Sequence, residues 1–184
     1  MTRFFIALLP PQHIQDYANE IKQYFADNYA SRVAQKSPPH ITLQPPFEWS
    51  DAEVPQLEAS LQAFAQTQQS ISITLQDYAA FPPRVIYINV IKSQEIWKLQ
   101  NQLIIHTASH LGIKDQKSAT RPFTPHLTVA FRDLTKENFR AAWPEFAQRS
   151  LNFDFMAENL TLLIHDGKRW NVKSEFDFHP ASAL

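Results

Sequence analysis

The sequence contains no cysteine and only two glycines, Gly112 and Gly167, in 184 residues. The lack of cysteine excludes disulfides, thiolate zinc sites and a cysteine nucleophile, and it is typical of the reducing cytoplasm. The scarcity of glycine excludes the glycine-rich phosphate loops of P-loop and dinucleotide-binding proteins. Any phosphate chemistry in this chain must therefore depend on side chains.

An excess of positive charge and a long apolar run are missing as well. The formal net charge is −1, whereas proteins that grip a long nucleic acid are usually strongly basic. The apolar run from Phe4 to Leu9 is too short to cross a membrane, and Pro10-Pro11 follows it. We therefore expect a cytoplasmic protein that binds neither a membrane nor a long nucleic-acid tract.

What the chain does have is apolar residues in regular patterns, with 44% hydrophobic and 12% aromatic content. The length fits one domain over 1–184, built from two lobes. Apolar spacing predicts helices over 12–29, 51–68, 93–111 and 135–147. It predicts strands over 3–9, 40–43, 71–76, 84–91, 126–131, 159–165 and 170–178. Hairpins interrupt the alternation of strands and helices, which favours an α+β fold over a doubly wound parallel sheet.

Two five-residue segments carry the same polar pair in the same context: Pro39-His40-Ile41-Thr42-Leu43 and Pro125-His126-Leu127-Thr128-Val129. Side chains two residues apart in a strand point to the same face, so each histidine shares a face with its threonine. The repeat indicates an internal duplication. If the two strands lie side by side, two imidazoles and two hydroxyls meet in one cleft.

That set of groups suits hydrolysis of a phosphodiester. Imidazole has an unperturbed pKa of about 6.5, so one ring can accept a proton from water while the other donates one to the leaving oxygen. Threonine hydroxyls can donate to the non-bridging phosphate oxygens. A single His-x-Thr strand is more often structural, and threonine is a good strand former in any case; the repetition is what favours chemistry.

Other assignments find less support. The remaining histidines fit surface or structural positions: His13, His106, His110, His165 and His179. A metal site on His40 and His126 lacks a carboxylate within either motif, and no Gly-x-Ser-x-Gly elbow occurs. We therefore favour a phosphodiesterase over two alternatives. These are a non-catalytic nucleotide- or RNA-binding module and a metal-dependent hydrolase.

The paired His-x-Thr segments, about ninety residues apart in a chain of this size, resemble the 2H phosphoesterase superfamily, also called LigT-like or 2′-5′ RNA ligase-like proteins. The resemblance covers essentially the whole chain, from the strand at 3–9 to the closing hairpin with Asp166-Gly167. It implies a bilobal α+β fold, a pseudo-twofold arrangement of two antiparallel sheets flanked by helices, and a central cleft. It also implies cleavage of a 2′,3′-cyclic phosphate or a related phosphodiester to a monoester, commonly on an RNA terminus or a nucleotide. We expect a monomer that needs neither metal nor cofactor.

The resemblance makes His40 and His126 the catalytic pair and Thr42 and Thr128 the phosphate ligands. His40 is provisionally the general acid and His126 the general base, and the reverse stays open. Many members have an arginine five residues after the second histidine; Phe131 stands there in this chain.

Arg132 follows one residue later, and we expect it on the opposite strand face. Gln44-Pro45-Pro46-Phe47 replaces a more usual glycine-containing segment, which indicates a divergent branch. The candidates for substrate charge are Arg84, Arg121 and Arg132, and the candidates for base stacking or core packing are Phe47, Phe81 and Trp170.

Overall fold

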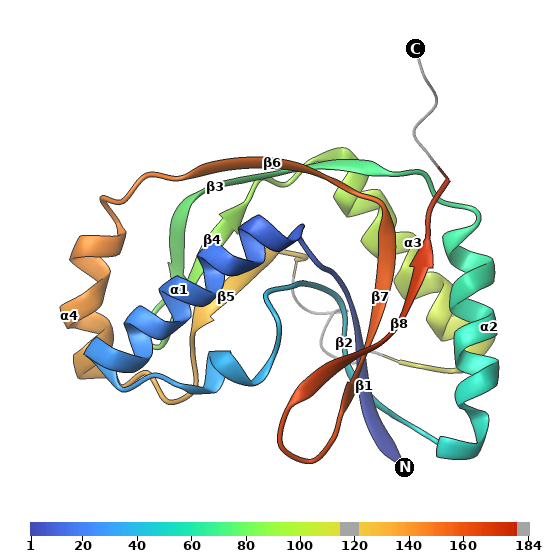
Figure 1. Cartoon of the computed structure of the whole chain (residues 1–184). Helices are drawn as coiled ribbons and strands as arrows, with labels where there is room; N and C mark the ends of the chain where they lie inside the picture. Colours follow the sequence, from blue (N-terminus) through green and yellow to red (C-terminus); the bar gives the residue numbers. More distant parts are fainter. Residues whose placement is uncertain (115–121, 180–184) are drawn as a thin grey trace.

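The computed structural model describes residues 1–114 and 122–179, which form two four-stranded antiparallel sheets and their helices (Figure 1). The strands are β1 (Thr2–Leu8), β2 (Ile41–Trp49), β3 (Ile71–Phe81), β4 (Val85–Val90), β5 (His126–Ala130), β6 (Asn152–Ala157), β7 (Asn159–His165) and β8 (Trp170–Asp177). The helices are α1 (Gln12–Tyr29), α2 (Val54–Ala65), α3 (Gln94–Leu111) and α4 (Lys136–Phe146), with short 3-10 helices η1 (Val33–Lys36) and η2 (Asp51–Glu53).

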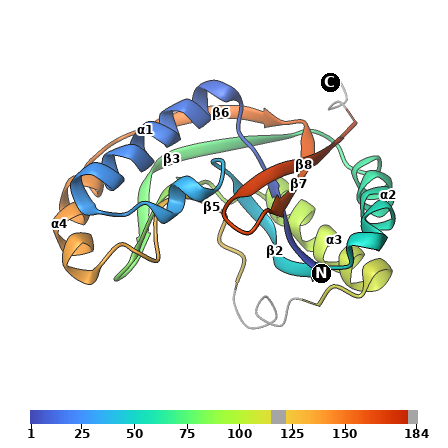
Figure 2. The same ribbon diagram turned by 60° about the horizontal axis from the view of Figure 1, so that its bottom comes forward.

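The two sheets repeat one plan. Their strand orders are β2-β1-β7-β8 and β5-β4-β3-β6, so β2 corresponds to β5 and β1 to β4. β2 and β5 are both edge strands, each follows a helix, and they contact each other between the lobes (Figure 2). The predicted α+β fold with duplicated antiparallel sheets is thus confirmed, and the duplication carries the two histidine-bearing strands to facing edges.

The helices are exchanged between the lobes. α1 connects β1 to β2 but packs against β5, whereas α3 connects β4 to β5 and packs against β2. The lobe of the β5-β4-β3-β6 sheet therefore carries α1 and α4, and the other lobe carries α2 and α3 (Figure 1). One continuous apolar core contains buried residues of both sheets, and in it the rings of Phe25 and Phe146 lie 4.5 Å apart.

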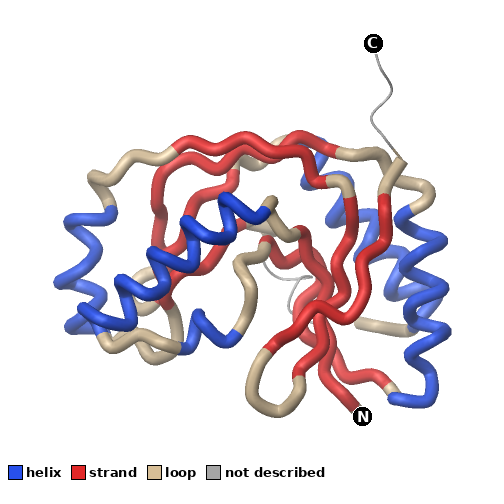
Figure 3. The backbone as a smooth tube through the Cα atoms, in the orientation of Figure 1, coloured by secondary structure: helices blue, strands red, loops and turns tan. Residues whose placement is uncertain are grey.

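Three strands differ most from the expectations. β3 continues to Phe81 instead of ending at Gln76. Asn152–Ala157 forms β6, which the sequence analysis did not predict, and β6 runs beside β3 across the molecule (Figure 3). β2 does not end at Leu43, as predicted, but continues through Pro45-Pro46 to Trp49. Phe4 pairs with Phe47 and Ile6 with Gln44, so the two prolines occupy a bulge. A bulge on an edge strand tolerates proline because its missing N–H is not needed there.

Across the two described ranges of the chain, the helices include none that is long and apolar enough to span a membrane.

Candidate active site

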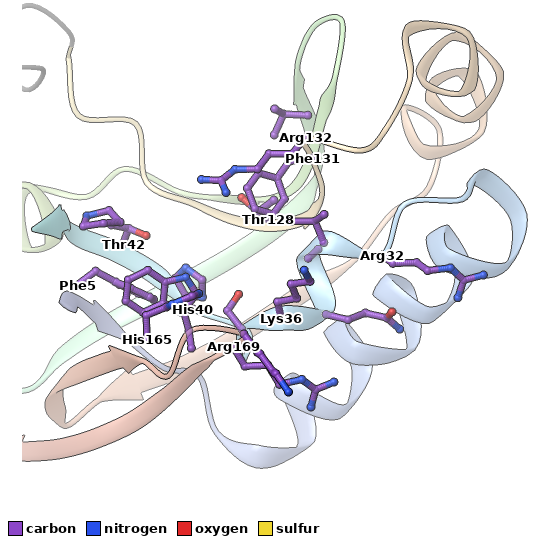
Figure 4. Close-up of a pocket in the computed structure, with 18 of the residues that line it drawn as sticks. Phe5, Arg32, Lys36, His40, Thr42, Thr128, Phe131, Arg132, His165 and Arg169 are labelled. Atoms are coloured by element: carbon purple, nitrogen blue, oxygen red, sulfur yellow. The ribbon is translucent and has the colours of Figure 1, made fainter. Parts of the chain in front are cut away.

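His40 and His126 line one cleft between the lobes, about 980 Å³ in volume (Figure 4). His40 immediately precedes β2, and His126 is the first residue of β5. Thr42 and Thr128 line the same cleft. The charge of His126 lowers the pKa of His40, so the two imidazoles lie within electrostatic range of each other.

Strand alternation accounts for this arrangement. The apolar residues between and after the polar ones, Ile41, Leu43, Leu127 and Val129, are all at most 1% exposed and lie in the core. The histidines and threonines are half-buried on the opposite face. The prolines that precede the histidines, Pro39 and Pro125, are buried and keep the chain extended as it enters each strand.

Each imidazole is fixed by a carbonyl group two residues earlier. His40 Nδ1 lies 2.7 Å from the Pro38 oxygen, and His126 Nδ1 lies 2.7 Å from the Thr124 oxygen. A carbonyl oxygen can only accept, so Nδ1 is the donor in both rings. Nε2 is then the nitrogen of each ring that remains to take up or release a proton at a bound ligand.

Aromatic side chains surround both imidazoles. The ring of Phe5 lies 4.7 Å from that of His40, and Phe81 and Tyr87 each lie 5.2 Å from His126. These apolar rings limit the access of water to the imidazoles. Phe81 and Trp170 line the cleft, whereas Phe47 packs against the core beside Phe4.

Burial lowers the pKa of both histidines because the charged ring loses solvation. The pKa of His40 falls to about 4, and the charges of Lys22 and His126 contribute to that shift while the Pro38 carbonyl opposes it. The pKa of His126 is lowered by burial and opposed by the Thr124 carbonyl. At neutral pH His40 is therefore a neutral ring, suited to accept a proton.

Lys22 lies behind the segment that leads into His40. Its side chain on α1 is 1% exposed, and Nζ donates a hydrogen bond of 2.9 Å to the Ser37 carbonyl oxygen. Burial lowers the pKa of this amine to about 7. No sequence motif pointed to Lys22, because it stands at a buried position of a helix that the apolar pattern had already explained.

The three arginines proposed from the sequence have different outcomes. Arg132 lines the cleft, and its guanidinium lies 5.2 Å from the centre of the Phe131 ring, which lines the cleft as well (Figure 4). The expectation that Arg132 lies on the opposite face was wrong: β5 ends at Ala130, and Arg132 adopts a left-handed conformation with φ of 58°. Arg84 is exposed at the β3–β4 turn outside the cleft lining. Arg121 lies outside the described residues.

Other basic residues of the cleft escaped the sequence analysis. They come from η1 with the residue before it and from the β7–β8 turn: Arg32, Lys36, Lys168 and Arg169. The adjacent Lys168 and Arg169 follow the predicted Asp166-Gly167 turn, so the turn itself was a usable signal for them.

Asp133 fixes η1 beside the end of β5. Its carboxylate accepts hydrogen bonds from the Ser31 hydroxyl at 2.9 Å, the Arg32 amide at 2.6 Å and the Val33 amide at 3.0 Å. This one side chain therefore ties the loop after α1 to the loop that carries Arg132.

No group of three or more His, Asp or Glu side chains within residues 1–114 and 122–179 is arranged to hold a metal ion.

The chain resembles known proteins over nearly its full length. A family model described as the 2′-5′ RNA ligase superfamily matches residues 10–169, a range that includes both His-x-Thr segments. A protein of Geobacillus sp. (strain WCH70), whose name assigns it provisionally to the phosphoesterases, is 28% identical over 177 residues and 95% of each chain. A similarly named protein of Bacillus pumilus (strain SAFR-032) is 29% identical over 177 residues, covering 95% of this chain and 96% of its own.

Solved structures show the same fold at lower identity. TT0787 of Thermus thermophilus has a TM-score of 0.66 at 20% identity, covering 98% of this chain and 100% of that one. Escherichia coli LigT in complex with 3′-AMP has a TM-score of 0.64 at 20% identity, covering 96% and 98%. The family match, the duplicated fold and the two histidines in one cleft agree: this chain belongs to the 2′-5′ RNA ligase superfamily, the 2H phosphoesterases that its His-x-Thr segments resemble.

Proposed function

We propose that this protein hydrolyses a 2′,3′-cyclic phosphate on a nucleotide or RNA terminus to a monoester, with its two histidines as base and acid. The observation that carries the proposal is the matched pair of imidazoles in one cleft, each with Nδ1 hydrogen-bonded to a backbone carbonyl. The 3′-AMP bound to E. coli LigT supports a nucleotide as the substrate class.

In the proposed reaction, His40 Nε2 takes a proton from a water molecule as the water oxygen forms a bond to phosphorus. The bond from phosphorus to one ribose oxygen breaks, and protonated His126 donates its Nε2 proton to that leaving oxygen. His40 ends protonated and His126 neutral, so a proton transfer through solvent restores the starting state. Each role typically contributes about 10²–10⁴-fold.

The pKa values favour these roles over the provisional assignment made from the sequence. The ring with the pKa of about 4 is the one that stays neutral and ready to accept a proton, which is His40. His126 is lowered as well, but a bound phosphate raises the pKa of both rings because opposite charge stabilises the protonated form. We therefore make His126 the general acid.

Thr42, Thr128 and Arg132 bind the reacting phosphate in this scheme. The hydroxyls of Thr42 and Thr128 stand on the same strand faces as the imidazoles and donate to the non-bridging oxygens, whose charge grows in the transition state. Arg132 supplies the nearby positive charge that Phe131 cannot.

The test is incubation with each of the four nucleoside 2′,3′-cyclic phosphates, with and without EDTA, followed by separation of the monoesters. We expect hydrolysis that falls about 10²–10⁴-fold in His40→Ala and in His126→Ala. His13→Ala is the matched control, since His13 is exposed at the start of α1 and outside the cleft lining.

Full activity in both cleft variants would overturn the proposal. Nucleotide binding without any turnover would instead support a binding module. Activity that EDTA removes and added metal restores would support a metal-dependent hydrolase.

A further inference from the structure

Positive charge in the cleft exceeds what one phosphodiester needs. Among residues 1–114 and 122–179, the lining contains five lysine and arginine residues and no aspartate or glutamate, although the whole chain has a net charge of −1. Arg132 with the two threonines already supplies donors for the reacting phosphate. Lys36 on η1 and Lys168 and Arg169 in the β7–β8 turn form a second group, which we call the basic arm.

The three cationic side chains of the basic arm lie close together in the cleft. Figure 4 shows Lys36 between Thr128 and Arg169, while Arg32 points away from them. Burial and the charge of Arg3 lower the pKa of His165, which directly precedes the turn; Asp166 opposes that shift, and the charge of Lys36 adds to it, so η1 and the turn lie within electrostatic range. Both segments line the same cleft as the two catalytic histidines.

The acidic residue of the turn, Asp166, forms no ion pair with these cations. The carboxylate of Asp166 accepts hydrogen bonds from the backbone amides of Lys168 and Arg169 at 2.8 and 2.7 Å and from the Asn171 side chain at 2.9 Å. Those bonds lower the pKa of Asp166 to about 2 and hold the turn in one conformation. Within the described part of the chain, the side chains of Lys36, Lys168 and Arg169 form no ion pair.

The backbone on both sides of the basic arm is fixed before any ligand binds. Asp133 anchors the start of η1 through three hydrogen bonds, and Asp166 closes the turn. Cations on fixed backbone bind an anion with less loss of conformational freedom than cations on a mobile loop. The volume of the cleft, about 980 Å³, is at the upper end of the range of about 300–1,000 Å³ for small-molecule sites.

We propose that the basic arm binds a second phosphate of the substrate, the one on the 5′-oxygen of the terminal nucleoside. This inference rests on the proposed function. It makes the preferred substrate an RNA end of at least two nucleotides, whose internucleotide phosphate occupies the basic arm while the cyclic phosphate lies between the histidines. A free 5′-monophosphate has the same chemistry and is distinguished below.

The experiment compares kcat/KM for three substrates: adenosine 2′,3′-cyclic phosphate, the same compound with a 5′-phosphate, and the dinucleotide ApA ending in a 2′,3′-cyclic phosphate. We expect the dinucleotide to be preferred over the simple cyclic nucleotide by about tenfold. In the double variant Lys168→Ala/Arg169→Ala that preference disappears, and kcat/KM for the simple cyclic nucleotide changes by less than about threefold. Lys98→Ala/Arg140→Ala, at two exposed sites outside the lining, is the matched control.

Two outcomes identify the source of the phosphate, and two others overturn the proposal. An equal gain for the 5′-phosphorylated nucleotide and the dinucleotide supports a site for any 5′-phosphate, and a gain only for the dinucleotide that the double variant loses supports an internucleotide phosphate. A preference that survives in the double variant, or no preference in the wild type, overturns the proposal.

A binding measurement separates failure of this inference from failure of the proposed function. If no substrate is hydrolysed, calorimetric titration with adenosine 3′-monophosphate and with ApA 3′-monophosphate replaces kinetics. Tighter binding of the dinucleotide that the double variant abolishes would support the basic arm although the enzyme proposal had failed. Equal affinities would overturn it.

Discussion

Replacement of Lys22 by methionine should stabilise the protein. The amine is 1% exposed and donates to the Ser37 carbonyl oxygen, and burial lowers its pKa from 10.5 to about 7. Methionine has a similar length, carries no charge and adapts to irregular space in a core. The substitution therefore removes the cost of burying an ammonium group and retains most of the packing.

The magnitude follows from the pKa. The interval between 10.5 and about 7 corresponds to about 5 kcal/mol, because each pKa unit is worth about 1.4 kcal/mol. Loss of the hydrogen bond to Ser37 costs about 1 kcal/mol, and a buried carbonyl without its partner costs somewhat more. We expect Lys22→Met to raise the free energy of unfolding by about 2–4 kcal/mol at about pH 6.

The gain in the free energy of unfolding of Lys22→Met over the wild type depends on pH. Native Lys22 releases its proton near pH 7 and unfolded Lys22 near pH 10.5, so the unfolded wild type binds more protons over this interval. Wild-type stability therefore rises with pH there, and the advantage of the variant is largest below pH 7 and shrinks toward pH 10.5.

Urea unfolding at about pH 6, 8 and 9.5 measures the effect. Lys98→Met, at an exposed position of α3, is the control and should change stability by less than about 0.5 kcal/mol. A Lys22→Met protein that is less stable than the wild type at the lowest pH, or an advantage that does not vary with pH, would refute the reasoning.

Three other outcomes are expected. Thr42→Val and Thr128→Val should each lower kcat/KM for a cyclic nucleotide by about 10–100-fold through loss of one phosphate donor, and unchanged steady-state kinetics in both would remove the hydroxyls from the mechanism. The pH profile of kcat/KM should peak below about pH 6.5, because burial lowers the pKa of both His40, which must be neutral, and His126, which must be protonated. The profile of kcat should lie at higher pH, since bound phosphate raises both pKa values; an optimum of kcat/KM above about pH 8 would contradict this. Asp133→Ala removes the acceptor of three hydrogen bonds and should lower the free energy of unfolding by about 2–3 kcal/mol in urea titrations, whereas a loss below about 0.5 kcal/mol would show that η1 is held by other contacts.

The fold class was predictable because the apolar periodicity agreed with the topology along most of the chain. Ile41 and Leu43, like Leu127 and Val129, fall on the core face that strand alternation assigns to them. β6 was missed although Phe153 and Phe155 alternate with Asn152 and Asp154, because the alternation is short and Met156 interrupts it. The extension of β2 through Pro45-Pro46 depends on its being an edge strand, which only the sheet order determines.

The site was predictable where a motif carried it and not where tertiary contacts created it. The repeated His-x-Thr pattern identified the residues that now lie in one cleft, but Lys22 on α1 and Lys36 on η1 reach that region because α1 and η1 pack against β5. Arg132 shows the limit of alternation: the rule of opposite faces ends with the strand at Ala130, and one residue in the left-handed region redirects the chain.

The exchange of α1 and α3 between the lobes has a mechanical consequence. The chain passes from one lobe to the other at both ends of each of these helices, and again at the long strand β3 and between β6 and β7. No single connection can serve as a hinge, so the lobes should not swing apart as two bodies on one linker would. The distance between the two imidazoles is then fixed by the fold. The protein would select a substrate by whether its phosphate group fits between the two rings without a movement of the lobes.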